Sequence, residues 1–217
     1  MKHSTLPSIL YKYLTSFEDA KSFQNGETRF VNLSDYILTE DVTRKDVGEG
    51  YMDHIFDKNI DSELIKIESE NNVSYPNNPR EMIVCCFSSK LDDKLFDRFK
   101  CDYCIQVNNP KEYFNRINDK VNEMFTSKDV LAHNKVEYLD SPRQKGFING
   151  FCPIYKNIQY CVEEEYRFFF HLKQNMRIDQ PFITGKVFRA DYLVYRIKFN
   201  IGSISDITTI IDRNICF

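Results

Sequence analysis

The chain has 217 residues, of which 42% are hydrophobic and 14% aromatic, so it is long enough to bury the core of a single domain spanning 1–217. Its net charge of −3 excludes a broadly basic protein that holds duplex nucleic acid mainly through counterion release. We find no apolar stretch of about 18 residues and no secretory signal pattern, and therefore expect a cytoplasmic protein without a membrane partner.

The N-terminal residues predict a strand, a helix and a second strand. Residues 9–15 (ILYKYLT) and 28–34 (TRFVNLS) are rich in β-formers. Between them, residues 16–26 predict a helix. Ser16 is placed to cap its first turn, and Gly26 follows Asn25 at its end. Ser16 and Gly26 therefore mark the two ends of the predicted helix.

The middle of the chain begins with a polar segment, 35–80, which we interpret as a helical insertion. A short continuous apolar run at 81–89 (EMIVCCFSS) then predicts a buried strand. Residues 90–100 predict a short amphipathic helix and 102–108 another strand. The strongest helix prediction is 110–125, which starts at a proline and repeats apolar residues at helical spacing.

The sequence CDYC places Cys101 and Cys104 at a spacing that zinc sites and redox pairs use. No second pair at zinc-ribbon spacing follows, and the motif runs into a predicted strand, on which positions three apart face opposite ways. The seven cysteines are an odd number and are scattered. We therefore expect reduced, buried thiols, and no metal.

The C-terminal half contains a predicted strand at 135–140, a loop at 141–156 and a strongly aromatic run at 160–172, followed by 186–200 and the terminal segment. Helices and strands do not alternate regularly, so the pattern favours an α+β fold over parallel βαβ winding. With seven glycines and neither GxGxxG nor GxxxxGK[ST], a Rossmann or P-loop nucleotide site is not expected.

The aromatic run YCVEEEYRFFFHL contains three glutamates and an arginine. Read as one strand, its side chains alternate between two faces. One face carries Val162, Glu164, Tyr166, Phe168 and Phe170. The other carries Glu163, Glu165 and Arg167, followed by Phe169 and His171. The charged row is either a solvated face with an ion pair or the floor of a polar cleft, while Phe168 and Phe170 belong to the core.

Four pieces of the chain carry a resemblance. They are LYKYLTSFEDAKSFQNGETRFVNLSDY, IVCCFSS, DYCIQV and VEEEYRFFF, in that order. They resemble a bacterial family of cytosolic proteins filed as a domain of unknown function, with a Tyr-Lys/Arg-Tyr, a Cys-Phe-Ser and a Glu-x-Glu-Tyr-Arg motif. The Asn-Asp-Pro element usual in that family is missing, because the corresponding region reads SDYILTEDVT.

The same layout is similar to the ADP-ribosyltransferase fold, a split mixed or antiparallel sheet with flanking helices. In that superfamily an early strand contacts nicotinamide adenine dinucleotide (NAD), a middle strand braces the site, and a late strand presents catalytic glutamate. Carried over, these roles fall on Tyr11, Lys12 and Tyr13, on Ser88 and Ser89, and on Glu163 and Glu165. Lys12 stands where such enzymes usually have Arg or His.

The resemblance implies cleavage of the bond between the ribose and nicotinamide of NAD through an oxocarbenium-like transition state. A carboxylate stabilises the positive charge that develops there. Glu165 is the expected catalytic residue, and Glu163 assists the acceptor. For the pyrophosphate, the candidate donors are Arg29 and Lys12, and Arg167 is a further candidate for binding NAD. For the nicotinamide ring, Tyr13 or Tyr36 is the candidate wall.

The implied function is transfer of ADP-ribose to a protein or nucleic acid, as in toxins and phage-defence effectors, with an antitoxin as a possible partner. SPRQKGF (141–147) and RADYLVYRIK (189–198) are candidate basic grooves for nucleic acid. The alternatives are a non-catalytic module that binds a nucleotide or protein, and an NAD glycohydrolase. Purely structural roles are also consistent with the sequence: Arg29 pairs with Glu27, and Ser88 and Ser89 only end a strand and cap a helix.

Overall fold

The computed structural model describes residues 5–33, 82–124, 131–140, 153–171, 183–189 and 192–216. Its larger elements in chain order are β1 (Leu10–Leu14), α1 (Phe17–Gln24), β2 (Glu27–Asn32), β3 (Met82–Ser88), α4 (Asp93–Phe99), β4 (Tyr103–Val107), α5 (Pro110–Met124), β8 (Glu165–His171), β9 (Ile183–Arg189), β10 (Tyr192–Asn200) and β11 (Thr208–Asp212). The short elements are β5 (Ala132–Lys135), β6 (Glu137–Leu139), β7 (Tyr155–Asn157), the 3₁₀-helix η3 (Ile158–Glu163) and α6 (Arg213–Cys216). The segment 35–80 lies outside the described residues.

Outside 35–80, the predicted elements before residue 125 are confirmed. Ser16 caps α1 and accepts a hydrogen bond from the backbone N–H of Asp19 at 3.1 Å. Gly26 has φ +95°, and a Cβ there would lie 2.0 Å from the carbonyl oxygen of Gly202. Only glycine fits both the backbone conformation and this close approach, which ends the helix and lets β2 begin. α5 starts at Pro110, as predicted.

The fold is α+β with a mostly antiparallel sheet. Among the described residues, nine strands form this sheet, in the order β11-β4-β1-β3-β2-β10-β9, with β8 paired to β3 and β5 paired to β8. All of these pairs are antiparallel, whereas β6 and β7 form a separate parallel pair. The predicted strand 135–140 contains β6, while β5 at 132–135 was not predicted, and the end of the predicted loop 141–156 forms part of β7.

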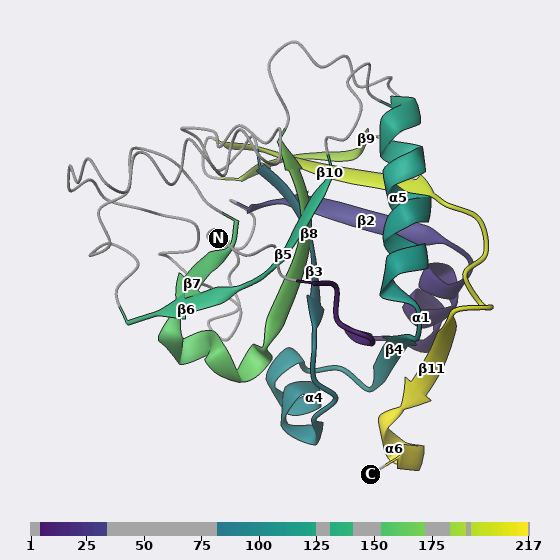
Figure 1. Ribbon diagram of the computed structural model, residues 1–217, viewed down its shortest axis with the longest axis vertical. Coiled ribbons are helices and arrows are strands. Elements are labelled where there is room, and N and C mark those ends of the chain that lie inside the picture. Colours follow the sequence, from purple (N-terminus) through teal and green to yellow (C-terminus); the bar gives the residue numbers. More distant parts are fainter. Residues whose placement is uncertain are drawn as a thin grey trace.

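β3 is the branch point of the sheet. Along one edge it pairs with β8 over its full length, from Met82 opposite His171 to Ser88 opposite Glu165. Along the other edge its first half pairs with β2, and its last residue, Ser88, pairs with Tyr11 of β1. The sheet therefore divides beside β3, with β2, β10 and β9 on one branch and β1, β4 and β11 on the other (Figure 1).

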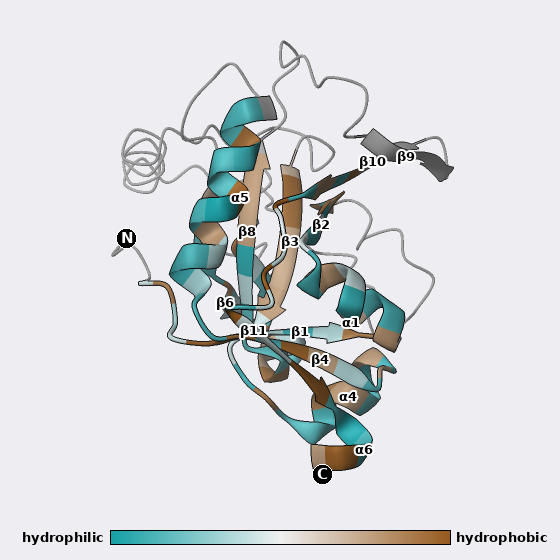
Figure 2. Cartoon of the chain, turned by 90° about the vertical axis from the view of Figure 1, so that its right-hand side faces the viewer, coloured by the Kyte–Doolittle hydropathy of each residue, from teal (hydrophilic) through white to brown (hydrophobic). Residues whose placement is uncertain are grey.

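Helices α1 and α5 cover one face of the sheet. Phe23 of α1 and Tyr113 of α5 pack with Phe87 of β3 and Phe168 of β8 in the main core. Figure 2 shows β3 and β8 as largely hydrophobic strands, with α5 hydrophilic over much of its length. This matches an amphipathic helix that buries only one stripe against the sheet.

The opposite face of the sheet carries two smaller clusters. One packs Val84 and Phe169 with Ile154 and Tyr155, beside β7. The other packs Phe96 of α4 against β4 and β11, with the tyrosines of β1 at its edge. Between them, this face presents the polar side chains of β8. The candidate site lies there.

Candidate functional site

A pocket of about 160 Å³ opens at the point where β1 meets β3. The residues that line it come from β1, β3, α4, β7, η3 and β8. They are Tyr11, Lys12, Tyr13, Cys86, Phe87, Ser88, Phe99, Lys156, Glu163 and Glu165. Segments far apart in the sequence thus contribute to one cavity: Lys12 and Cys86 are 74 positions apart, and Ser88 and Glu163 are 75 apart.

The prediction of one continuous strand over 160–172 is wrong in its first part. Residues 158–163 form η3, which Asn157 caps by accepting the N–H of Gln159. Glu164 adopts the left-handed conformation with φ 41°, and β8 starts at Glu165. Glu163 and Glu165 therefore reach the pocket from two different elements joined by a turn, rather than from alternate positions of one strand.

From Glu165 onwards the predicted alternation is correct. Tyr166, Phe168 and Phe170 face the main core, and Arg167 points the other way with Glu165. The charged face is not solvated, however, because Arg167 is fully buried and Glu165 is 5% exposed. The sequence allowed either a solvated face with an ion pair or the floor of a polar cleft. In the structure, Glu165 and Arg167 form a buried ion pair at the wall of a pocket.

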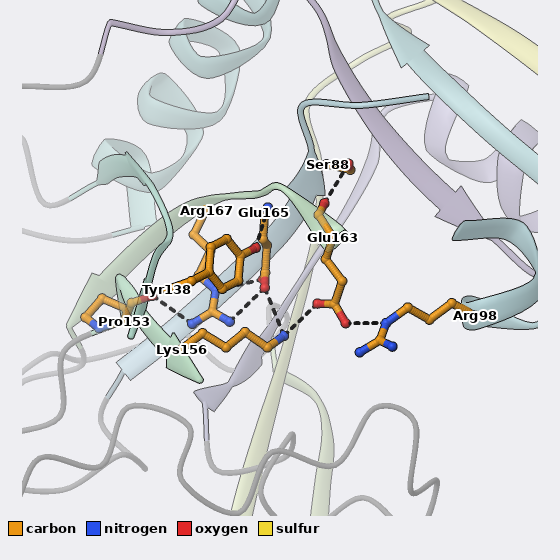
Figure 3. A network of polar contacts seen from close by, with 8 residues as sticks. All are labelled: Ser88, Arg98, Tyr138, Pro153, Lys156, Glu163, Glu165 and Arg167. Carbon is orange, nitrogen blue, oxygen red and sulfur yellow. Dashed lines mark hydrogen bonds and ion pairs between the residues drawn. The ribbon is translucent and has the colours of Figure 1, made fainter. Parts of the chain in front are cut away.

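Five charged side chains alternate in one network (Figure 3). Arg98 Nε donates to Glu163 Oε1 at 2.8 Å, and Lys156 Nζ donates to Glu163 Oε2 at 2.8 Å. The same ammonium donates to Glu165 Oε2 at 3.0 Å. Arg167 donates Nε to Glu165 Oε1 at 2.7 Å and Nη2 to Oε2 at 3.0 Å. Three cations thus surround two carboxylates.

This network keeps Glu165 ionised. Burial alone favours a neutral carboxyl group, but the charges and hydrogen bonds of Arg167 and Lys156 outweigh it and hold the pKa of Glu165 well below its ordinary value of 4.5. Such a carboxylate is a weak base. It suits electrostatic stabilisation of a cation better than proton transfer.

Hydroxyl groups fix the backbone around the carboxylates. Ser88 Oγ donates to the carbonyl oxygen of Glu163 at 2.7 Å, and Ser89 Oγ donates to that of Glu164 at 3.0 Å. The phenol oxygen of Tyr138 accepts the N–H of Glu165 at 2.7 Å. The two serines therefore bind the turn between η3 and β8. These hydrogen bonds hold the turn in place. Ser88 Oγ also accepts the N–H of Lys90.

The β1 side of the pocket is aromatic. Tyr13 packs edge-on against Phe96 at a centroid distance of 4.9 Å, and its hydroxyl accepts the N–H of Asp92 at 3.0 Å. Burial raises the pKa of Tyr13, so its phenol stays protonated. Lys12 reaches from β1 to β3, where Nζ donates to the carbonyl oxygen of Cys86 at 2.7 Å. Within the described part of the chain this ammonium has no carboxylate partner.

Most predicted site residues converge. Tyr11, Lys12, Tyr13, Ser88, Glu163 and Glu165 line the pocket. Ser89 and Arg167 contact it through the turn and the network. Arg29 is not among the lining residues: its exposed guanidinium pairs with Glu27 at 2.7 Å and with Asp19 at 3.4 Å. The ion pair with Glu27 that the sequence also allowed is therefore confirmed.

The remaining predicted residues and grooves lie outside the site or outside the described residues. Tyr36 and the candidate groove 141–147 lie outside the described residues. Of the second candidate groove, Lys198 pairs with Glu27 rather than standing free. Cys101 and Cys104 are buried beside Phe96, as expected for structural thiols. The described residues contain no cluster of metal-ligand side chains, and no described helix is long and apolar enough to cross a membrane.

Sequence reasoning missed three residues of the network. Lys156 belonged to a predicted loop, Arg98 to an ordinary amphipathic helix, and Tyr138 to a short strand. Lys156 and Arg98 also lie over the ring of Tyr160, at 4.8 Å and 5.4 Å from its centroid. Their carboxylate partners are set by tertiary structure, which no local pattern reveals.

Comparison of the chain with protein-family models, with curated proteins and with solved structures found no match. The functional argument therefore rests on the pocket itself.

Proposed function

We propose that the protein is an ADP-ribosyltransferase that takes ADP-ribose from NAD and transfers it to a macromolecular acceptor, protein or nucleic acid. One observation carries the proposal. The three motifs that resemble this enzyme class meet at a single pocket where the sheet divides. Its lining includes Tyr11, Lys12 and Tyr13 from the first motif, Ser88 from the second, and Glu163 and Glu165 from the third, while Ser89 binds the adjoining turn. A split antiparallel sheet with the acidic segment at the start of a strand beside the split is the arrangement expected of the ADP-ribosyltransferase fold.

The size of the pocket supports recognition of one end of NAD. A cavity of about 150 Å³ holds one benzene ring, so 160 Å³ admits a nicotinamide ring or a ribose but not the whole dinucleotide. Tyr11 and Tyr13 supply flat walls for a ring, and Lys12 supplies an ammonium for a phosphate. The pyrophosphate and adenosine would extend from the mouth of the pocket.

The charges support the chemistry. An oxocarbenium-like transition state places positive charge on the ribose, and an ionised carboxylate within contact distance lowers its energy. Both glutamates line the pocket, so its wall contains carboxylates. In this proposal the acceptor replaces nicotinamide at the ribose carbon, and the electron pair of the broken bond leaves with the nicotinamide nitrogen.

A second candidate, a non-catalytic module that binds a nucleotide or a protein, is favoured by a different observation. Both oxygens of Glu165 already accept hydrogen bonds from cations, and Arg167 takes both of them in a fork. Such a buried carboxylate can serve structure alone. The two candidates share the pocket and differ in whether nicotinamide is released.

The test is incubation of the purified protein with NAD labelled in its adenylate part, in lysate that is afterwards separated into protein and nucleic-acid fractions. The variants are Glu163→Gln and Glu165→Gln. Glu123→Gln is the matched control, since it changes the same group on the exposed face of α5. We expect nicotinamide release and label in one fraction with the wild type and the control, and loss of both in at least one pocket variant.

Other outcomes separate the alternatives. Free ADP-ribose without labelled macromolecule identifies an NAD glycohydrolase. A folded wild-type protein that releases no nicotinamide refutes the enzyme, and binding of NAD without release then supports the non-catalytic module. A transferase of this kind fits the role of a toxin or phage-defence effector held in check by a partner protein. Coexpression with neighbouring open reading frames, scored by rescue of growth, tests that role.

A further inference from the structure

The two carboxylates of the pocket are equally buried but differ in their hydrogen bonds. The side chains of Glu163 and Glu165 are 6% and 7% exposed, so exposure does not distinguish them. A carboxylate offers about four lone-pair positions for donors. The glutamate with fewer of its lone-pair positions occupied by protein donors can accept more hydrogen bonds from a ligand.

Glu165 is saturated. It accepts two hydrogen bonds from Arg167 and one from Lys156, and the thiol of Cys86 donates a further one. Its main partner, Arg167, is fully buried and also donates Nη1 to the carbonyl oxygen of Pro153 at 2.7 Å. A ligand could reach a lone pair of Glu165 only by breaking a buried ion pair.

Glu163 has capacity left. Within the described part of the chain its carboxylate accepts one hydrogen bond from Arg98 and one from Lys156, which leaves about two positions. Arg98 is a quarter exposed, unlike Arg167, and it comes from α4, at the edge of the pocket. Breaking the part-exposed pair of Arg98 with Glu163 therefore costs less than breaking the buried pair of Arg167 with Glu165.

We propose that Glu163 is the carboxylate that contacts the ligand in this pocket, and that Glu165 is a structural residue that pairs with Lys156 and Arg167. The proposal rests on the proposed function for the identity of the ligand, the ribose and nicotinamide end of NAD. It reverses the roles that the sequence resemblance implies, under which Glu165 is catalytic and Glu163 assists.

The test compares Glu163→Gln, Glu165→Gln and the control Glu123→Gln by thermal unfolding and by nicotinamide release at 15 °C. We expect Glu163→Gln to keep its Tm within about 4 °C and to lose nicotinamide release by about 100-fold or more. We expect Glu165→Gln to lower Tm by about 10 °C, because it removes the carboxylate that pairs with buried Arg167, and to keep release within about 10-fold of wild type.

The reverse pattern, a 100-fold loss in folded Glu165→Gln with activity retained in Glu163→Gln, overturns the proposal and leaves the transferase intact. If Glu165→Gln does not fold, the double variant Glu165→Gln with Arg167→Met removes both charges of the buried pair and gives the same activity comparison. If wild type releases no nicotinamide, the proposed transferase activity is refuted, and the Tm values alone test the role of Glu165. A larger loss of Tm in Glu165→Gln than in Glu163→Gln supports the structural role of Glu165. Equal losses, or a larger loss in Glu163→Gln, overturn it.

Discussion

Arg167→Met tests the energetics of the network directly. Methionine fills a similar volume but removes the two hydrogen bonds to Glu165 and the one to the carbonyl oxygen of Pro153. Because Arg167 is fully buried, its loss leaves Glu165 with an uncompensated share of charge in the protein interior. Removing one partner of a buried ion pair costs about 3–5 kcal/mol.

That cost is a large part of the free energy of unfolding, which is about 5–15 kcal/mol for a folded domain. Urea denaturation at pH 7 measures it. The matched control is Arg116→Met on α5, since Arg116 donates to Glu112, to Asp206 and to the carbonyl oxygen of Ser203. These contacts are at the surface, and the control should lose about 1 kcal/mol or less. Similar losses in the two variants would refute the assignment of a buried, energetically coupled network.

The pH dependence carries a second check. The pKa of Glu165 is lowered in the folded protein, so its ion pairs contribute full stability above its ordinary value of 4.5, and this contribution is lost as pH falls below it. Arg167→Met has already lost most of the contribution at neutral pH. The difference in unfolding free energy between wild type and variant should therefore shrink between pH 7 and pH 3. A difference that stays constant over this range would contradict the argument.

Three further predictions concern single residues. Glu164→Gly should stabilise the protein by about 0.5–1 kcal/mol in urea denaturation, because Glu164 has φ 41° and glycine adopts this conformation without the Cβ penalty; a loss would show that its contact with Ser89 matters more. Ser16→Ala should cost about 1 kcal/mol by removing the cap of α1, and an unchanged urea midpoint would argue against the cap. Iodoacetamide at pH 7 should modify exposed Cys161 well before Cys86, whose thiol has a raised pKa because of desolvation and the nearby Glu165; equal rates by mass spectrometry would exclude this environment.

The elements that could be predicted from the sequence are those that local chemistry determines. The helix at 17–24 was readable because Ser16 and Gly26 bracket it, and α5 because Pro110 begins an amphipathic pattern. The buried strand at 82–88 was readable from its continuous apolar run. None of these predictions depends on residues that are distant in the sequence.

The turn before β8 could not be predicted in the same way. Tyr160, Cys161 and Val162 are β-formers or neutral, so propensity favoured a strand. The 3₁₀-helix forms instead because Asn157 caps it and the serines after β3 bind the backbone of the following turn. Asn157 was a usable local signal. The serine contacts depend on tertiary structure.

The candidate site was predicted only in part for a related reason. Glu163, Glu165 and Arg167 stood out because they interrupt an aromatic run. Lys156 did not, since an isolated lysine in a loop-like segment is usually solvated. Its burial between two carboxylates follows from the pairing of β6 with β7 beside the end of β8, and that register has no signature in the sequence.

The position of β3 also has a consequence for how the chain is made. Both of its first neighbours, β1 and β2, leave the ribosome before it, but β8, which covers its other edge along its whole length, follows only after about 80 residues of further synthesis. Until then an almost wholly apolar strand presents an unpaired edge, which favours pairing with other nascent chains. Yield of the native protein should therefore depend on the rate of translation and on chaperones that shield the nascent strand.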